Sequence, residues 1–588
     1  MSGGAARLLS RVLWLAIPAF LPVVFMPFAR NPFGAVKEDA FMLLGLAQLA
    51  VLAVRDGGSL RPIAGRLVRL PVVWPVLAFA GLAAGREALA GAGSADWPAF
   101  LALVVGAALG LALAAEDERG LGRRMLAAFL AGAAGAAGYG AVQFAGRDPL
   151  VWQRAFAGGA PGSSLGNPLF LGTVLAAAIP VTLAFWLEAG SRRAVAGLFA
   201  LLGLETIVLI MAQARGAWAG AALASALVIA WRGRGTGGAT GKLAAWGVVA
   251  VACLVALARP GLAGGAGPVA HAASLFSPGG GQWRGRFLMW EATARMARER
   301  PLAGWGTGGV GTRYLEFQGV LLATPRYADQ PYRSTAHSHQ DWLQFLAERG
   351  TAGLGIFLWL VAAAAARARG AARAPASRGA ACALAGWLVD GMVNGPLHVP
   401  PSSALCWIFL GIAVRDDDAA GRTTGAGRAA GAGSPAPAPV RTRSGRLALA
   451  VAAVLVVSAR GAGRDLAGEA YLQSGVVRLE GGEPARALPY LARAAALALE
   501  DRRHHFEAGR AWFLLGSYGD AVREFEADVA LNPAVHSGWH NLGLGLLKLE
   551  RREEALAAFR KAEALNPRDA DTRRMIGAAR GTPMRGKL

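Results

Sequence analysis

Long apolar runs recur along most of the chain, and they constrain its fold more than any other feature. A helix needs about 20 apolar residues to cross the hydrocarbon core of a bilayer. Of the 588 residues, 54% are hydrophobic and 17% are charged, whereas soluble proteins are about one-quarter charged. The sequence therefore predicts an all-α, polytopic membrane helix bundle with about 12–13 transmembrane helices. The runs lie at 11–29, 38–54, 70–85, 97–115, 125–145, 165–187, 194–212, 214–231, 242–259, 342–366, 379–395 and 402–415, with a shorter one at 445–459.

Positive charge is concentrated in the short loops between these runs. The net charge of +22 would suit nucleic acid, but its placement in such loops is the pattern that sets membrane orientation, so we expect no nucleic-acid partner. The five short loops on one side carry 16 Lys and Arg residues and those on the other side carry 6, when Lys242 and Arg215 at the edges of their runs are counted with the adjoining loops. The positive-inside rule therefore places the N-terminus in the cytoplasm and the long loop 260–341 outside.

The chain divides into four parts by composition. Residues 1–415 contain the twelve longer runs and form the predicted membrane domain. Residues 416–444 are rich in Gly, Ala, Pro and Arg, which predicts a flexible cytoplasmic linker. We expect 445–459 to be the last transmembrane helix, which would carry everything after it to the outside.

The C-terminal part, 466–580, contains a repeat with a period of 34 residues. An Asn-Pro pair at 532–533 recurs at 566–567, and an Ala and a Phe recur at the same offset. This period is typical of tetratricopeptide (TPR) repeats, which are paired helices. About three repeats would stack into an α-solenoid. We expect a protein partner here. We also expect the repeats to be dispensable for chemistry but not for partner choice, because a linker and a span separate them from the site.

Two arginines lie at span ends or in the outer loop, where charged groups are functional candidates. Arg215 lies between two apolar runs, and Arg286 lies in 283–300, which predicts an amphipathic helix with its aromatic residues on one face. A guanidinium binds phosphate oxygens bidentately, so both are candidate phosphate ligands. The alternative is that they reach membrane lipid headgroups or solvate the polar face of a surface helix.

Two histidines, His337 and His339, immediately precede the run 342–366. An imidazole with its unperturbed pKa of about 6.5 suits proton transfer near neutral pH; the alternative is a polar cap at the membrane interface. Together with Asp341 they are few ligands for zinc, and their spacing is not His-Glu-x-x-His. We therefore expect neither a metal nor a cofactor. The glycine-rich segment 301–314 lacks the Gly-Lys-Ser/Thr of a phosphate loop and predicts a tight connection with close backbone approach.

Five short motifs stand out in the chain. They are SSLGNPLFLG at 163–172, QARGA at 213–217, RFLMW at 286–290, PLAGWG at 301–306 and HQDWLQFLAERG at 339–350. Together they resemble the bacterial O-antigen ligases and the related O-antigen polymerases and O-oligosaccharyltransferases. The resemblance covers roughly 10–415, and its specific part lies between 210 and 355. The sequence departs from the family pattern at Gln340, where Asn is common, and at Ala214, where Ser is common.

The resemblance implies a metal-independent glycosyltransferase that moves a glycan from an undecaprenyl-pyrophosphate carrier to an acceptor at the periplasmic face of the bacterial inner membrane. It implies a multi-pass protein whose active site is periplasmic, and the expected span at 445–459 would place the TPR domain on the same side. Arg215 and Arg286 would bind the pyrophosphate, and His339 would act on the acceptor hydroxyl as a general base or as an orienting group. His337 and Trp290 would be further substrate contacts.

The acceptor separates the two enzymatic interpretations. A ligase transfers the lipid-linked oligosaccharide to lipid A-core or to protein, whereas a polymerase extends the lipid-linked glycan. A non-enzymatic alternative is a membrane scaffold or transporter with a TPR partner-binding domain. A transport path needs ionisable groups deep within spans, and Asp390 and Asn394 are the candidates for that role. We expect these two residues to pair with neighbouring helices instead.

Overall fold

The computed structural model describes most of the chain as α-helices. The described residues are 3–25, 34–55, 65–90, 97–149, 160–231, 247, 281–371, 374–399, 401–415, 444–497 and 502–581. Within these ranges there is no strand, and every predicted span is a helix, which confirms the all-α membrane bundle with C-terminal repeats. The predicted span 242–259 and the linker 416–443 lie outside the described residues, apart from residue 247.

The membrane part consists of thirteen described helices from α1 to α16. Four are both long and apolar enough to cross a membrane, namely α6, α7, α8 and most of α14, and four shorter apolar helices accompany them. The bounds are α1 Gly3–Phe20, α2 Gly34–Arg55, α4 Val73–Ala90, α5 Trp97–Ala115, α6 Leu121–Phe144, α7 Pro168–Glu188, α8 Arg192–Met211, α9 Arg215–Trp231, α12 Gly281–Glu299, α13 Gly309–Leu322, α14 Asp341–Ala371, α15 Pro375–Asp390 and α16 Ser402–Val414.

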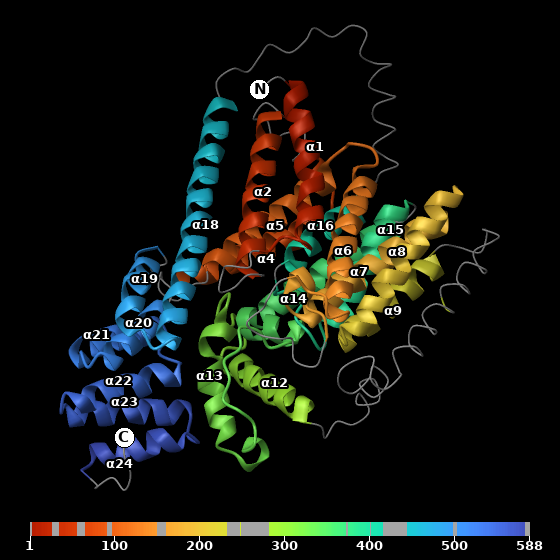
Figure 1. The fold of residues 1–588 in the computed structure, drawn as a ribbon. Coiled ribbons are helices and arrows are strands. Elements are labelled where there is room, and N and C mark those ends of the chain that lie inside the picture. Colours follow the sequence, from red (N-terminus) through yellow and green to blue (C-terminus); the bar gives the residue numbers. More distant parts are fainter. Residues whose placement is uncertain are drawn as a thin grey trace.

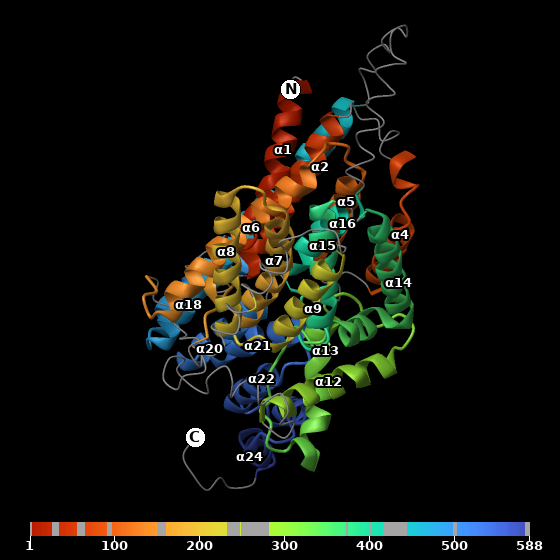
Figure 2. The ribbon, with the colours of Figure 1, turned by 90° about the vertical axis from the view of Figure 1, so that its right-hand side faces the viewer.

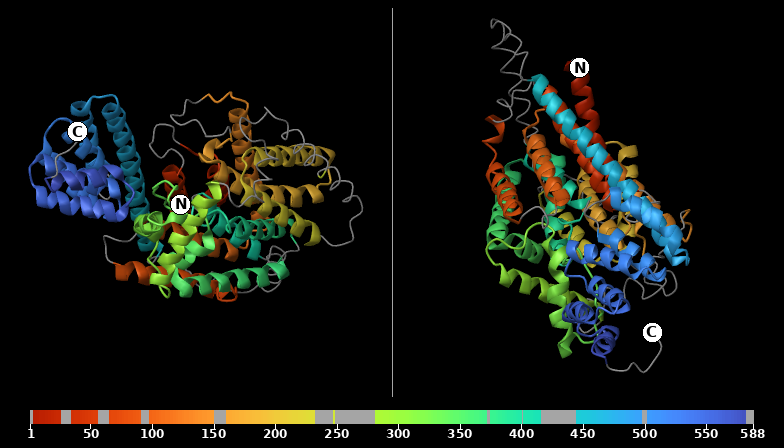
Figure 3. Two further views of the ribbon diagram at one scale, coloured as in Figure 1. Left: turned by 90° about the horizontal axis from the view of Figure 1, so that it is seen from below. Right: turned by 90° about the vertical axis from the view of Figure 1, so that its left-hand side faces the viewer.

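The start of α18 and the start of α1 lie at one end of the molecule, and α12, α13 and the repeats lie at the other (Figure 1). Helix α18, Ser444–Glu480, is 37 residues long and packs along α2. The predicted last span at 445–459 and the first helix of the repeats are therefore one continuous helix. Figure 2 shows α6, α7, α8 and α9 together in the bundle, and the view from below in Figure 3 shows the repeats beside it.

Two glycines allow α9 and α15 to pack with their backbones in close contact. A methyl group on Gly386 of α15 would lie 2.7 Å from the carbonyl oxygen of Gly220 on α9, and one on Gly220 would clash with the carbonyl of Gly386. Small residues of this kind are typical of tightly packed membrane helices. The contact brings the first residue of α9, Arg215, towards the last residue of α15, Asp390.

The C-terminal helices repeat one packing contact at the predicted period. A methyl group on Gly509 would lie 2.6 Å from the ring of Phe525, and a methyl group on Gly543 would lie 2.6 Å from the ring of Phe559. Both pairs are offset by 34 residues, which confirms the repeat. The helices are α19 Pro484–Leu497, α20 Arg502–Leu514, α21 Tyr518–Leu531, α22 His536–Lys548, α23 Arg552–Leu565 and α24 Ala570–Ala579.

The repeats contact the outer loop, although a linker and a span separate them from it along the chain. Gly319 of α13 lies against the backbone of Leu565 at the end of α23. Arg568 Nη1 donates a hydrogen bond to the carbonyl oxygen of Gln330, at 2.8 Å. The linker sets only the distance along the chain, and the continuous helix α18 returns the repeats to the loop.

We expect Gly386→Ala to destabilise the protein because the new methyl group meets the α9 backbone. Overpacking of this kind costs roughly 1–3 kcal/mol. The matched control is Gly203→Ala on α8, where a methyl group meets nothing within 4 Å and the higher helix propensity of Ala acts alone. Thermal unfolding in detergent measures both. An equal effect of the two variants would show that the glycine contact does not hold α9 against α15.

Fusions to a periplasm-active reporter test the side of each segment. Because α13 and the repeats touch, a reporter fused after Gly319 and one fused after Pro484 should both be active. A reporter fused after Ala372 should be inactive, since one span then separates it from the outer loop. Opposite activities at Gly319 and Pro484 would contradict the contact between the repeats and the loop.

Candidate active site

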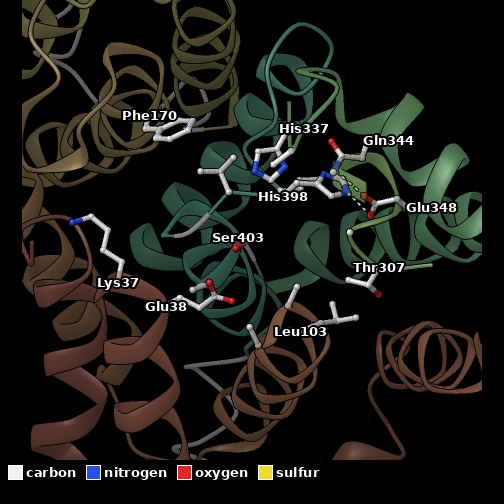
Figure 4. A pocket seen from close by; sticks show the side chains of 18 of the residues that line it. Lys37, Glu38, Leu103, Phe170, Thr307, His337, Gln344, Glu348, His398 and Ser403 are labelled. Atoms are coloured by element: carbon white, nitrogen blue, oxygen red, sulfur yellow. Dashed lines mark hydrogen bonds and ion pairs between the residues drawn. The ribbon is translucent and has the colours of Figure 1, made fainter. Parts of the chain in front are cut away.

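A cavity of about 640 Å³ opens between the start of α2, the start of α7, α5 and the loop that leads into α14. Lys37 and Glu38 lie on one side of it, and His337, His398 and Glu348 lie on the other (Figure 4). Its wall mixes apolar side chains with hydrogen-bonding groups, a lining that suits an amphipathic substrate. Further polar lining comes from Asn167, Thr307, Gln344, Arg349 and Ser403.

His339 has a left-handed backbone conformation, with φ of +52°. An L-residue pays roughly 1–2 kcal/mol for this conformation, so it persists where surrounding contacts enforce it. Of the described non-glycine residues, Ser163, Gln213 and Glu550 also have positive φ. Three of these four residues lie in the sequence motifs SSLGNPLFLG, QARGA and HQDWLQFLAERG, and Glu550 lies in a turn of the repeats. Backbone strain in the membrane part therefore coincides with these motifs.

Side-chain hydrogen bonds fix the loop that carries both histidines. Ser338 N–H donates to Gln344 Oε1 at 3.0 Å, and Ser338 Oγ donates to the carbonyl of Gln340 at 2.8 Å. The Gln340 side chain accepts from Leu343 N–H, so it caps the first turn of α14. Gln340, where the family commonly has Asn, thus performs a helix-capping role that Asn also performs well.

The glycine-rich segment packs against a break in α14. Trp305 N–H and Gly306 N–H donate to the carbonyls of Ala347 and Glu348, each at 2.9 Å. Gly350 interrupts α14 with φ of +65°. This confirms the predicted close backbone approach, because side chains in the segment would collide with the helix. The break and the segment together fix the direction in which α14 begins.

Arg286 is held by the end of α15. Its Nη1 donates to the carbonyl of Val393, and its Nη2 lies 3.5 Å from Asn394 Oδ1. Asn394 Nδ2 and Thr173 Oγ1 each donate to the carboxylate of Asp390 at 2.6 Å. Asp390 and Asn394 therefore pair with neighbouring groups, as expected, and they also position the Arg286 guanidinium.

Arg215, Arg286 and His339 converge from α9, α12 and the loop before α14. Burial lowers the pKa of Arg286, and the nearby positive charge of Arg215 lowers it further. The pKa of His339 is lowered to about 4, mainly by burial and to a smaller extent by the nearby Arg286 and His337. Two guanidinium groups thus share a partly dry site with a neutral imidazole, an arrangement suited to a multiply charged anion.

His337 faces the cavity (Figure 4). Burial lowers its pKa to about 4, with a smaller effect of His398, so its ring is neutral at pH 7. Its Nδ1 is buried without a hydrogen-bond partner in the structure. A buried polar atom is costly to leave unpaired, so this nitrogen is available to a ligand in the cavity. The two histidines thus face different surroundings, since His339 adjoins the arginines.

Trp290 belongs to an aromatic stripe on α12. Its ring centroid lies 6.3 Å from that of Trp283 and 5.7 Å from that of Phe287. The predicted amphipathic helix 283–300 is confirmed as α12, with these rings on one face. Trp290 is not among the residues that line the cavity, so the structure does not place this predicted substrate contact beside His337.

A buried chain of polar residues joins α14 to the segment after α15. His398 Nδ1 lies 2.6 Å from Asp341 Oδ1, and His398 Nε2 lies 4.0 Å from Glu348 Oε2. Gln344 Nε2 donates to Glu348 Oε1 at 3.0 Å. The sequence contains one signal for this chain, since Asp341, Gln344 and Glu348 follow a helical spacing. His398 lies in a short apolar loop that gives no such signal.

Lys37 was also not identified from the sequence. It is 1% exposed, and its Nζ donates to the carbonyl of Ser164 at 2.9 Å and to that of Val24. Asn167 Oδ1 accepts from Leu169 N–H at 2.8 Å and caps α7, with Pro168 at the first helical position. The Gly-Asn-Pro motif thus starts α7 at the cavity wall. The hydrogen bond from Lys37 to the carbonyl of Ser164 stabilises the turn that precedes this motif.

Comparison with known proteins agrees with this division of the chain. Residues 198–358 match the family model described as O-antigen ligase, and residues 536–569 match a model described as tetratricopeptide repeat. The first match contains Arg215, Arg286, His337 and His339. The sequence matches none of the curated proteins with which it was compared.

Solved structures similar to this chain include repeat proteins. MamA is 24% identical over 20% of this chain and 64% of its own, with a TM-score of 0.19. YrrB, a TPR protein with an unusual peptide-binding site, is 24% identical over 24% of this chain and 75% of its own, with a TM-score of 0.18. TTC0263, a thermophilic TPR protein in Thermus thermophilus, is 21% identical over 37% of this chain and 98% of its own, with a TM-score of 0.17.

This chain spans 64% of the length of the MamA structure. Its membrane part and its C-terminal part carry separate matches, in the order that the motifs and the 34-residue period predict. The chain therefore combines a region similar to O-antigen ligase, within a bundle of apolar helices, with C-terminal tetratricopeptide repeats.

Proposed function

We propose that the protein transfers a glycan from an undecaprenyl-pyrophosphate carrier to an acceptor at the outer face of the bacterial inner membrane. The observation that best supports this is the convergence of Arg215, Arg286 and His339 in the region that matches O-antigen ligase. In this proposal 1–415 is the catalytic membrane domain, with the outer loop and the repeats in the periplasm.

The two arginines bind the pyrophosphate of the donor. Its leaving group gains negative charge as the bond between the anomeric carbon and the phosphate oxygen breaks. Fixed cations in a partly dry site stabilise that charge without the reorganisation that water would need. The carboxylate of Asp390, held by Thr173 and Asn394, offsets part of the repulsion between the arginines when no donor is bound.

His339 accepts the proton of the acceptor hydroxyl as its oxygen bonds to the anomeric carbon. At neutral pH the imidazole has a free lone pair, because burial and Arg286 hold its pKa near 4. A base with so low a pKa is weak. Donor pyrophosphate offsets the charge of Arg286 and so raises the pKa of His339, which makes the base stronger when the donor is in place.

The cavity beside His337 takes part of a glycan substrate in this proposal. Its polar groups, among them Asn167, Thr307 and Ser403, suit sugar hydroxyls. A ligase acting on lipid A-core or protein and a polymerase that extends the carrier-linked glycan differ in the acceptor. The contact between the repeats and the outer loop favours a ligase whose acceptor, or a partner protein, is recognised beside the site.

Glycan profiling of a deletion strain distinguishes these acceptors. Loss of capped lipid A-core or of protein glycan is the expected result. Shortened carrier-linked chains with normal capping would favour the polymerase. If the glycans on lipid A-core, on protein and on the carrier are all unchanged, the result would favour the scaffold or transporter interpretation and contradict the proposal.

We expect His339→Ala to lower turnover about 100-fold or more while donor binding survives, because general-base help contributes roughly 10²–10⁴-fold. His337→Ala should be milder. Arg215→Lys and Arg286→Lys should weaken donor binding about 10-fold or more despite the retained charge, since a bidentate grip needs the guanidinium plane. Donor binding and single-turnover transfer in detergent or nanodiscs measure these effects separately.

The matched control is Arg284→Lys. Arg284 lies on the same helix as Arg286 but pairs with Asp329 at the surface, so donor binding should stay near wild type. If His339→Ala retains near-normal turnover and His337→Ala is inactive, the general base is His337, which lines the cavity. Normal turnover of both histidine variants would contradict base catalysis by this loop.

The acidic limb of the pH profile should lie near the pKa of His339. The kcat/KM for donor reports the free enzyme, so it should stay constant from about pH 8 to pH 5.5 and fall as the pH approaches about 4, where the imidazole becomes protonated. Arg286→Gln should shift this limb to higher pH, because removal of a positive charge raises the pKa of a nearby histidine. A wild-type midpoint near pH 6.5 would contradict the buried, neutral imidazole.

A further inference from the structure

A cluster of four side chains lies in the repeats, apart from the candidate active site. His536 and His540 are one turn apart on α22, so both rings project from the same face. Asp569 caps the start of α24, where it accepts from Thr572 N–H at 3.0 Å. The rings of the two histidines are stacked, with centroids 5.7 Å apart. The two histidines therefore belong to α22, whereas Asp569 and Thr572, the other two members, belong to the start of α24.

The polar atoms of the cluster converge on a small volume. His536 Nε2 lies 3.2 Å and His540 Nδ1 lies 3.9 Å from Asp569 Oδ2, and the candidate ligand atoms of these three residues lie within 4.8 Å of one another. Thr572 Oγ1 lies 3.0 Å from His536 Nε2, 2.8 Å from His540 Nδ1 and 2.5 Å from Asp569 Oδ2.

These distances bracket the spacing of ligands around one ion. Ligands about 2.0–2.1 Å from a tetrahedral zinc ion lie roughly 3.3–3.4 Å apart. The histidine nitrogens lie between 2.8 and 3.9 Å from Thr572 Oγ1 and Asp569 Oδ2. The 2.5 Å between Thr572 Oγ1 and Asp569 Oδ2 is the length of a hydrogen bond, and this distance would increase when both oxygens bind an ion.

The cluster has a second interpretation without an ion. The Thr572 hydroxyl donates to Asp569 and accepts N–H bonds from both imidazoles, which satisfies all four groups. That interpretation requires a proton on each of the two facing nitrogens, whereas a metal ion replaces both protons. Each imidazole has a second ring nitrogen that can carry its proton instead, so both facing nitrogens can offer a lone pair to an ion.

We propose that His536, His540, Asp569 and Thr572 form a binding site for a divalent transition-metal ion of the zinc, cobalt or nickel type. A set of two imidazoles and one carboxylate binds such ions in preference to magnesium or calcium, which favour ligands that are all oxygen atoms. The site is separate from the arginines and His339, and it carries no step of the glycosyl transfer. Its ion would be structural.

The position of the cluster gives the ion a role at the joint between the repeats and the outer loop. His536 N–H donates to Tyr332 Oη at 3.3 Å, and the two rings meet edge to face. Arg568, next to Asp569, donates to the carbonyl of Gln330. An ion that links α22 to α24 would stabilise both contacts, which lie five and seven residues before His337. The ion would therefore fasten the repeats to the segment that leads into the site.

The test uses tag-free, full-length protein stripped with a chelator and dialysed against zinc. We expect about one equivalent of zinc by elemental analysis, and the thermal unfolding temperature should rise when zinc is restored. His536→Ala and His540→Ala should each reduce bound zinc at least tenfold. Asp569→Asn should reduce it too, although Asn keeps the helix cap. The matched control, His505→Ala, removes a histidine that pairs with Glu524 elsewhere in the repeats and should retain the equivalent.

Less than a tenth of an equivalent in folded wild-type protein would overturn the proposal, and the hydrogen-bonded interpretation would then hold. Zinc that stays bound in His536→Ala and His540→Ala would place the ion elsewhere and would also overturn it. Thr572→Val separates the two interpretations further. Weaker zinc binding is expected if the hydroxyl is a ligand. Full zinc binding in Thr572→Val together with loss in the histidine variants would remove Thr572 from the site and contradict the four-ligand set.

Discussion

The close contact between α9 and α15 at Gly220 and Gly386 is the constraint on which the candidate site depends. Backbones that touch leave no room for side chains, so the start of α9 and the end of α15 must lie together. Arg215 begins one of these helices and Asp390 ends the other. Arg286 then docks on the residues after Asp390 through Val393 and Asn394. The contact between these two glycines thus brings the guanidinium groups of Arg215 and Arg286 close to the carboxylate of Asp390.

The outer loop is fixed from two sides. On the membrane side, the glycine-rich segment lies against the break in α14 at Gly350, and Gln340 caps the helix that begins after His339. On the far side, the repeats contact α13 and Gln330. The strained backbone of His339 lies between these supports, so the loop geometry is imposed by its surroundings. In our proposal this rigidity keeps the acceptor base aligned with the donor phosphates.

Periodic features were predictable from the sequence, and single long-range contacts were not. Apolar runs of span length and the 34-residue period gave the helices and the repeats, because both patterns are local. Arg215, Arg286 and His339 were found as charged or titratable groups in unusual places, and the structure brings them together. His398 was missed because an isolated polar residue in an apolar loop forms no pattern. Lys37 was missed because it stands beside Glu38 and Asp39 at the edge of a predicted span, where charged residues are ordinary. The contact between the repeats and the outer loop was also not predicted, because separation along the chain says little about distance in space.

The central claim is that Arg215 and Arg286 bind the pyrophosphate beside His339. An experimental structure of the full-length protein in a nanodisc with a lipid-pyrophosphate glycan donor tests it most directly. We expect phosphate oxygens within hydrogen-bond distance of both guanidinium groups, with Arg286 released from the carbonyl of Val393 and His339 facing the anomeric carbon. Phosphates bound at the Lys37 side of the cavity, with Arg286 still on Val393 and Asn394, would contradict the claim.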